Sequence, residues 1–295
     1  MKVKKAVFPV AGMGTRFLPA TKANPKEMLP IVDKPLIQYA AEEAIAAGVN
    51  ELIFVTSSSK HAIEDHFDKN YEMETELEKR GKHELLNILK GIVPDGVSCV
   101  YVRQPEALGL GHAVLCAKPV VGNEPFAVIL ADDMINGGDN PCLSQMVGVF
   151  NDKQASILGV ERVEPSETNK YGIVNTVEGG GQLNNVSGIV EKPQPDEAPS
   201  NLAVVGRYIL TPEIFGLLEK TERGAGGEIQ LTDAIAMLLN GQDVFAYEFE
   251  GKRFDCGSKL GYLQATVEYA LEHEDLGEEF RAYLKSFVCD VGLEG

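Results

Sequence analysis

The sequence predicts an α/β fold: a Rossmann-like, mostly parallel mixed sheet flanked by helices, with a small β-rich part. Short apolar runs alternate with helical patterns in the first half of the chain. This alternation is typical of parallel strands that are joined by right-handed crossover helices. The second half has more strand patterns and fewer helices between them. The 295 residues, of which 44% are hydrophobic, are enough to bury one large core.

Continuous apolar runs mark the strands of the first half, and apolar residues at helical spacing mark its helices. Pro35 suits the first position of a helix, and Gly48 suits the C-cap of the same helix. The expected strands are residues 6–10, 51–56, 97–103 and 126–130. The expected helices are residues 35–47, 71–89 (as a pair) and 111–118, with a further helix that ends at residue 67.

The second half of the chain contains mainly strand patterns, followed by helices near its end. The expected strands are residues 155–162, 172–177, 183–191, 202–210, 244–249 and 253–255. The expected helices are residues 212–219, 231–239 and 258–273, followed by further C-terminal helices. We find neither an internal repeat nor a flexible linker, so we expect residues 1–295 to form a single domain.

The composition excludes several classes of partner. Lys and Arg number 27 against 44 Asp and Glu, so the net charge is −17, and such an acidic surface repels nucleic acid and anionic membranes. No apolar stretch approaches the roughly 18 residues of a membrane helix. Pro9 and Gly12 interrupt the N-terminal apolar run, which argues against a signal peptide. The five cysteines include no C-x-x-C pair, which favours reduced thiols in the cytoplasm.

The loop after the first predicted strand carries the strongest chemical signal. It contains Gly12 and Gly14, and cations at positions 16, 22 and 26. Glycine lets backbone N–H groups approach a phosphate, and Arg and Lys neutralise the phosphate charge. Phe17 stands where a dinucleotide fingerprint needs glycine, and no P-loop Gly-Lys-Ser/Thr follows. We predict a nucleoside triphosphate loop; the alternative is a plain strand-to-helix turn with solvated cations.

Two other polar motifs follow predicted strands. The amide of Gln104 offers a donor and an acceptor, which suits the imide edge of uracil or thymine; the alternative is a polar loop. Asp132 and Asp133 follow the apolar run 126–130, where carboxylates suit Mg²⁺ or, alternatively, an Asx turn or helix cap. Ligands of parallel α/β sheets bind beyond the carboxyl ends of the strands. We therefore expect both motifs to share one site with the glycine loop.

A further motif, Glu191-Lys192-Pro193, ends a predicted strand of the second half. One acceptor beside one cation suits a sugar phosphate, with Glu191 on hydroxyl groups and Lys192 on the phosphate. Taken by itself, the motif fits a surface ion pair better, and such a pair contributes little to stability.

The stretch VFPVAGMGTRFLPATKANPKEMLPIVDKP, residues 7–35, resembles the signature of the sugar-1-phosphate nucleotidylyltransferases. The resemblance continues in VRQPEALGLGHA, LADD, VEKP, GGEIQLTDAI and FDCGSKLGY, so that it spans residues 4–269 and favours the uridylyltransferase branch. It implies the nucleotidyltransferase fold. The implied parts are a nucleotide-binding half (1–150), a sugar-phosphate-binding half (151–260) and C-terminal helices (261–295).

The resemblance also implies which residues act. The catalytic cations are Arg16, Lys26 and Lys192. The nucleotide-binding residues are Ala11, Gly12, Gly14, Thr15, Glu27, Gln104 and Gly109. The sugar-phosphate-binding residues are Asp133, Gly172, Glu191 and Lys192, and the ligands of the Mg²⁺ cofactor are Asp132 and Asp255.

The reaction implied by the resemblance converts UTP and α-D-glucose 1-phosphate into UDP-glucose and pyrophosphate. The sugar phosphate attacks the α-phosphorus of UTP directly and in line, with assistance from Mg²⁺. A phosphate monoester is already mostly dianionic at neutral pH, so neither a general base nor a covalent enzyme intermediate is required. Two alternatives stay open: a glucose-1-phosphate thymidylyltransferase and a non-catalytic regulatory paralogue. The resemblance further implies a homodimer or homotetramer, and the apolar positions within residues 280–287 are candidates for the contact.

Overall fold

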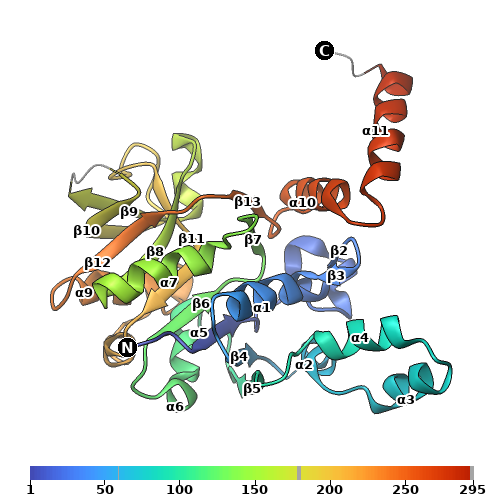
Figure 1. The fold of residues 1–295 in the computed structure, drawn as a ribbon. Coiled ribbons are helices and arrows are strands. Elements are labelled where there is room, and N and C mark those ends of the chain that lie inside the picture. The colour runs from blue at the N-terminus through green and yellow to red at the C-terminus, as the bar shows by residue number, and fades with distance from the viewer. Residues whose placement is uncertain (59, 178–180, 293–295) are drawn as a thin grey trace.

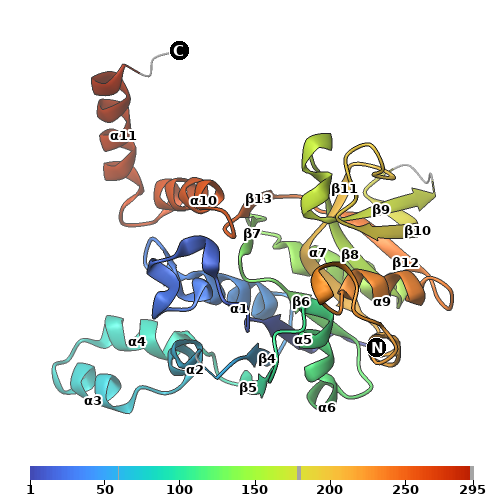
Figure 2. The same ribbon diagram turned by 180° about the vertical axis from the view of Figure 1, so that it is seen from behind.

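A large mixed sheet runs through the molecule, and helices cover both of its faces (Figures 1 and 2). The computed structural model describes the chain except for residues 59, 178–180 and 293–295. Within the described part, the large sheet has nine strands. They are β1 (Lys5–Pro9), β4 (Glu51–Thr56), β5 (Ser98–Arg103), β6 (Phe126–Ile129), β8 (Ser156–Arg162), β9 (Gly172–Val177), β10 (Leu183–Glu191), β11 (Leu202–Leu210) and β12 (Val244–Glu248). Their spatial order is β5-β4-β1-β6-β11-β8-β12-β10-β9.

The described residues form helices on each face of the sheet and further helices outside these two layers. They are α1 (Leu36–Ala46), α2 (His61–Phe67), α3 (Tyr71–Lys79), α4 (His83–Gly91), α5 (Leu110–Cys116), α6 (Lys118–Val121), α7 (Cys142–Lys153), α8 (Glu213–Leu218), α9 (Leu231–Leu238), α10 (Lys259–Glu272) and α11 (Gly277–Val291). Buried side chains of α1, α2 and α7 join the hydrophobic cluster on one face, and those of α5, α6, α8 and α9 join the cluster on the other.

The strands β5, β4, β1 and β6 are parallel neighbours, so their carboxyl ends meet at one edge of the sheet. Successive residues of β1 face opposite layers: Ala6 and Phe8 pack on the α1 side and Val7 packs on the α5 side. Burial on both faces explains why these strands are continuous apolar runs in the sequence. Pro9, which has no N–H donor, is the last residue of β1, where strand pairing ends.

The prediction of a mixed sheet flanked by helices is confirmed, but parallel pairing dominates only the first half of the chain. β11 pairs antiparallel with β6, β8 and β9, and β10 pairs antiparallel with β9 and β12. β8 and β12 are parallel. The β-rich second half therefore continues the same sheet, which places the nucleotide and sugar motifs on one framework.

Sequence patterns did not indicate α7 or three short strands. Leu143, Met146 and Phe150 of α7 are buried at helical spacing, but Gly148 and the polar residues around them obscure the pattern. β7 (Asp133–Asn136) pairs antiparallel with β13 (Lys252–Asp255), and β2 (Pro30–Ile31) pairs with β3 (Lys34–Pro35). Two- to four-residue strands carry too few residues for a periodic signal.

A buried ion pair ties α1 to β11 at the centre of the molecule. Arg207 is 1% exposed and donates through Nε and Nη2 to both carboxylate oxygens of Glu43, at 2.7 to 3.2 Å. Its Nη1 donates to the carbonyl of Leu130 at 3.1 Å. Such a bidentate pair fixes geometry as well as charge. The pair therefore anchors the strand end from which Asp132 and Asp133 follow.

The last helix, α11, leaves the body of the protein, whereas α10 packs on it through the buried side chain of Ala265. Ser258, the first residue of the expected helix 258–273, is the N-cap of α10, since its Oγ accepts the N–H of Gly261 at 3.1 Å. Figure 1 shows α11 projecting from the far end of α10, away from the sheet. Its side chains Tyr283 and Phe287 are 59% and 43% exposed. Among the described residues, no helix has the length and apolar character needed to cross a membrane.

Candidate active site

The predicted motifs lie at the carboxyl edge of the parallel strands. The glycine loop follows β1, Gln104 follows β5, and the Asp132-Asp133 pair follows β6. The three motifs therefore share one edge of the sheet, because parallel neighbours point their carboxyl ends in one direction.

The backbone conformation of Gly14 determines the direction of the glycine loop after β1. Its backbone is left-handed, with φ at 65°, which favours glycine. A Cβ at this position would lie 3.2 Å from Cβ of Lys26, and the carbonyl of Gly14 accepts the hydroxyl of Thr21 at 2.7 Å. The loop is therefore closed on itself, which brings the residues after Gly14 beside Lys26.

Lys26 and Asp132 form an ion pair across this edge, with Lys26 Nζ 2.5 Å from Asp132 Oδ2. Burial lowers the pKa of Lys26, but the charges of Asp132 and Glu27 outweigh burial and hold that pKa above its usual 10.5. Burial raises the pKa of Asp132, but the charge of Lys26 outweighs it and holds that pKa below its usual 3.8. Both side chains are therefore charged at neutral pH.

Gly257 brings Asp132, Asp255 and Arg16 to one point. A Cβ on Gly257 would lie 2.9 Å from Asp255 Oδ1, 3.0 Å from Asp132 Oδ2 and 3.4 Å from Arg16 Nη1. Gly257 also donates its N–H to Asp255 Oδ1 at 3.0 Å and accepts from Arg16 Nη1 at 3.5 Å. A cavity of about 260 Å³, the first cavity, opens here, and its lining residues are Gly14, Thr15, Arg16, Phe17, Lys26 and Gly257.

The pairing of β7 with β13 explains how two distant aspartates meet. Asp255 lies opposite Asp133 in this pair, and the N–H of Cys256 donates to the carbonyl of Asp132 at 2.8 Å. The hydroxyl of Ser258 donates to the carbonyl of Asp255 at 3.0 Å, so the N-terminus of α10 holds the end of β13. Strand pairing and a helix cap therefore fix both carboxylates.

The donors at this point fit a magnesium ion. Asp132 and Asp255 supply hard carboxylate oxygens that face the same space. Among the described residues, no group of three or more His, Cys, Asp or Glu side chains could hold a metal ion. Mg²⁺ usually takes one or two carboxylates and completes its shell with water and substrate phosphates. The residues therefore suit a metal that binds together with a phosphate ligand.

A second cavity, of about 230 Å³, holds the residues expected for the sugar phosphate. Asp133, Gly172, Glu191 and Lys192 all line it. Glu191 Oε2 accepts the hydroxyl of Thr232 at 2.5 Å, and Glu191 Oε1 lies 3.0 Å from Lys192 Nζ. Lys192 does not reach the first cavity in this structure. The Asp132-Asp133 dipeptide lies between the two cavities, with Asp132 beside the first and Asp133 in the wall of the second.

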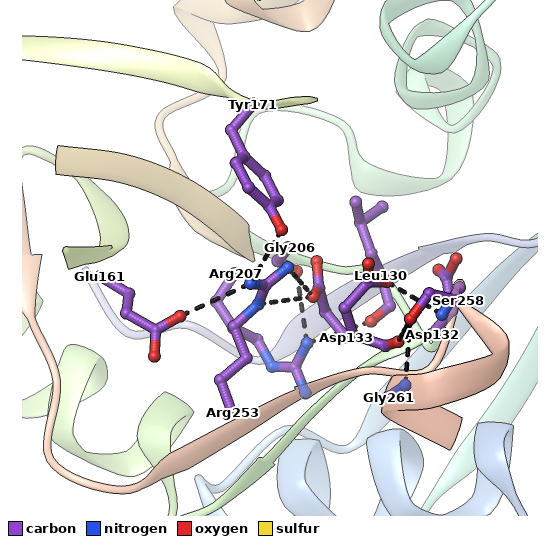
Figure 3. A network of polar contacts seen from close by, with 12 residues as sticks. Leu130, Asp132, Asp133, Glu161, Tyr171, Gly206, Arg207, Arg253, Ser258 and Gly261 are labelled. Atoms are coloured by element: carbon purple, nitrogen blue, oxygen red, sulfur yellow. Dashed lines mark hydrogen bonds and ion pairs between the residues drawn. The ribbon is translucent and has the colours of Figure 1, made fainter. Parts of the chain in front are cut away.

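Asp133 is part of a polar network that the sequence did not indicate. Its Oδ1 accepts Nε of Arg253 at 2.6 Å, and Arg253 Nη1 lies 3.5 Å from Glu161 and 3.4 Å from the hydroxyl of Tyr171 (Figure 3). The Arg253 guanidinium also lies over the ring of Tyr171, 5.0 Å from its centroid. One oxygen of Asp133 is therefore engaged by Arg253, and the role of Asp133 at the sugar stays a prediction.

Gln104 is 8% exposed and lies beside Gly109 and His112. Its Nε2 donates to the carbonyl of Gly109 at 3.1 Å and lies 3.0 Å from Nδ1 of His112. A Cβ on Gly109 would lie 2.6 Å from Cβ of Glu228. Packing against the Glu228 segment therefore requires glycine at position 109, independently of any ligand.

Three further residues predicted to bind the nucleotide are Ala11, Gly12 and Glu27. Ala11 lines a small cavity with Lys60, and Gly12 has open space around its Cβ position. Glu27, expected on the nucleotide, is only 1% exposed, and its Oε2 accepts Nζ of Lys60 at 2.7 Å. The carboxylate of Glu27 thus forms a buried ion pair with Lys60, because a buried charge needs a partner of opposite charge.

Sequence reasoning missed Lys60, Arg253 and Gly257. Gly257 belongs to the FDCGSKLGY segment and Arg253 directly precedes it, so the neighbours of Asp255 were the available signal. Lys60 follows β4 at the same sheet edge as the glycine loop, and the strand-end rule points to it.

Known proteins are similar to this chain in sequence. Residues 5–272 match the nucleotidyl transferase family. The UTP–glucose-1-phosphate uridylyltransferase of Bacillus subtilis strain 168 is 51% identical over 287 residues, which are 97% of this chain and 98% of that protein. The corresponding Staphylococcus epidermidis enzyme is 50% identical over 96% of this chain and 98% of its own.

Solved structures are similar along nearly the whole chain. A UTP-bound UGPase from Acinetobacter baumannii has a TM-score of 0.90 and 51% identity, covering 96% of this chain and 98% of that one. A UDP-glucose pyrophosphorylase complexed with UDP-glucose has a TM-score of 0.85 and 46% identity, covering 92% of this chain and 100% of that one. On its sequence and on its fold, the chain belongs to the nucleotidyl transferase family.

Proposed function

We propose that this protein transfers the uridylyl group of UTP to α-D-glucose 1-phosphate and releases pyrophosphate. The observation that carries the proposal is the meeting of Arg16, Lys26, Asp132 and Asp255 at the first cavity, next to the second cavity that Lys192 and Asp133 line. Relatives of about half-identical sequence are named for this reaction. The site retains every cation and carboxylate that the reaction needs, which argues against a non-catalytic paralogue.

The uracil base is assigned to Gln104 and Gly109. Both N–H donors of the Gln104 amide are directed at protein atoms, which leaves its Oε1 to accept the N3–H of uracil. The backbone of Gly109 lies beside this amide and is placed to meet a carbonyl of the base. The triphosphate then extends over Gly12, Gly14 and Thr15 toward Arg16 and Lys26.

The chemistry requires charge neutralisation and positioning. Asp132 and Asp255 would hold Mg²⁺, which when bound supplies a Lewis acid for the phosphate oxygens. Arg16 and Lys26 neutralise the triphosphate and the pyrophosphate that leaves. Lys192 holds the phosphate of glucose 1-phosphate, while Glu191 and the backbone of Gly172 contact the sugar. Since the nucleophile is already a dianion, its alignment with the α-phosphorus is the main task of these residues.

An assay of the purified protein tests the proposal. The protein is incubated with MgCl₂, glucose 1-phosphate and either UTP or dTTP, and UDP-glucose, dTDP-glucose and pyrophosphate are quantified. We expect equal amounts of UDP-glucose and pyrophosphate, and a higher kcat/KM for UTP than for dTTP. A pocket discriminates against one methyl group by about 10- to 200-fold. A preference for dTTP, or no nucleotide sugar at all, would overturn the assignment.

We also propose that the protein is a homodimer or homotetramer and works in the cytoplasm. The exposed apolar side chains of α11, together with Leu260 and Leu263 of α10 at 67% and 59% exposure, support a contact between copies. Light scattering on the intact chain, and on a Tyr283→Glu/Phe287→Glu variant, tests it. A monomeric wild-type protein would refute the assembly without affecting the proposed reaction.

A further inference from the structure

We propose that His112 is a positioning residue that fixes the amide orientation of Gln104 and thereby selects uracil over cytosine. The inference rests on the proposed function, because it concerns the base that Gln104 contacts. His112 lies on α5, and its Nδ1 is 3.0 Å from Nε2 of Gln104. Its Nε2 lies 3.9 Å from Sγ of Cys116, one helical turn further along α5.

The protonation of His112 follows from its neighbours. The carbonyl of Gly109 can only accept, so the Gln104 side-chain atom 3.1 Å from it must be the amide nitrogen. The same nitrogen faces Nδ1 of His112, so Nδ1 accepts and the ring proton lies on Nε2. There it points to Cys116, whose pKa burial raises, so that the sulfur is a neutral thiol and a weak acceptor. The Nε2–H tautomer of His112 therefore fits both contacts.

This arrangement leaves Gln104 with one defined ligand atom. Its two N–H donors are occupied by Gly109 and His112, and its Oε1 has no hydrogen-bond partner among the residues that the structure describes. No fully buried side-chain N or O atom of the described residues lacks a partner, so this Oε1 is open to a ligand although Gln104 is 8% exposed. The site therefore presents an acceptor, and a reversed amide would present a donor.

The acceptor discriminates between pyrimidines. Uracil carries a hydrogen on N3 and donates to Oε1, whereas N3 of neutral cytosine is itself an acceptor and faces Oε1 lone pair to lone pair. A buried polar group that meets the wrong partner is left unsatisfied, and sites of this kind discriminate strongly. Without His112, only the carbonyl of Gly109 restrains the amide, so both the affinity for UTP and the discrimination against CTP should fall.

The effect of substituting His112 on UTP recognition should be separable from any effect on the stability of the fold. His112 is only half-buried, whereas Ala113 and Val114 carry the packing of α5, at 3% and 0% exposure. His112→Leu removes the acceptor and replaces the imidazole with an apolar side chain of similar size. His112→Asn is the matched control, because its Oδ1 can replace Nδ1 as the acceptor.

The experiment compares kcat and KM for UTP and CTP in the wild type, H112L and H112N, with melting temperatures measured in parallel. In H112L we expect KM for UTP to rise about tenfold with kcat nearly unchanged, and the UTP-to-CTP ratio of kcat/KM to fall about tenfold. H112N should restore both values to within a factor of about three. An H112L variant that keeps the wild-type KM and ratio, or an H112N variant as impaired as H112L, would overturn the inference.

A double variant shows whether His112 acts through Gln104. In the Q104L background, H112L should change KM for UTP and the ratio by less than a factor of about two, since the amide to be positioned is gone. Full additivity of the two substitutions would overturn the inference. Wild-type turnover of UTP reports separately on the proposed function, so that failure of the reaction and failure of the positioning role give different results.

Discussion

Gly257→Ala tests the meeting point of the two aspartates most sharply. The added methyl group would lie 2.9 Å from Asp255 Oδ1 and 3.0 Å from Asp132 Oδ2, closer than carbon and oxygen normally approach. The backbone of Gly257 is outside the left-handed region, so alanine introduces no backbone strain. The perturbation is therefore confined to the two carboxylates and Arg16, whose Nη1 would lie 3.4 Å from the methyl group.

The size of the effect follows from these contacts. Each carboxylate must move by a few tenths of an ångström, while metal–ligand distances tolerate about 0.2 Å. A misplacement of about 1 Å costs a factor of about 100 in rate, so we expect kcat to fall about 10- to 100-fold and the Mg²⁺ requirement to rise. Alanine also restricts the unfolded chain, which offsets the local crowding, so the free energy of unfolding should change by less than about 1 kcal/mol.

The assay measures UDP-glucose formation across a MgCl₂ titration, with urea denaturation in parallel. Gly148→Ala in α7 is the matched control, since no atom lies within 4 Å of its Cβ position and the residue lines neither cavity. Wild-type kcat and Mg²⁺ dependence in the Gly257 variant would refute the reasoning. A large loss of stability would also count against it, because the perturbation would then not be confined to the site.

The other predictions concern single residues. Lys192→Ala should raise KM for glucose 1-phosphate by about 10- to 100-fold and leave KM for UTP within a factor of about two, because the lysine contacts only the sugar phosphate. Steady-state kinetics measure both constants, and an equal rise in KM for UTP would contradict this prediction. Asp132→Asn should lower kcat by about 100-fold or more at saturating MgCl₂, and wild-type turnover would disprove the metal assignment. Arg207→Leu should lower the free energy of unfolding by about 3 to 5 kcal/mol, because it leaves a buried glutamate unpaired, and a change below about 1 kcal/mol in urea denaturation would contradict this. Burial, and to a smaller extent the nearby aspartates, raise the pKa of the Cys256 thiol to about 12, so that this thiol stays protonated at pH 8. Iodoacetamide should therefore label the exposed Cys289 before Cys256. Peptide mapping that finds both cysteines labelled equally fast would contradict the burial of Cys256.

The fold could be predicted largely from hydrophobic patterns. The nine strands of the large sheet were expected within one or two residues, because burial on both faces gives long apolar runs. The mostly antiparallel pairing of β9, β10 and β11 could not be predicted, since a strand's own residues do not specify its neighbours. β7 was missed because four residues that begin with an aspartate have no pattern of their own.

The candidate site could be predicted only in part. The local sequence was enough to predict that the glycine loop, Gln104 and Asp132 lie at one edge of the sheet, because each follows a predicted strand. The link between Asp132 and Asp255 depends on the β7–β13 pairing across more than a hundred residues, and only the resemblance supplied it. The Glu27–Lys60 and Asp133–Arg253 ion pairs could not be predicted, because they join residues far apart in the sequence. Each forms when folding buries a carboxylate beside a cation of a different segment.

A crystal structure of the protein grown with UDP-glucose and MnCl₂, with anomalous data for manganese, tests the central claim most directly. We predict a manganese peak between the carboxylates of Asp132 and Asp255, in contact with the diphosphate, with Lys192 on the phosphate that carries the sugar. A peak at other residues, or a diphosphate that lies away from these two aspartates, would contradict the account.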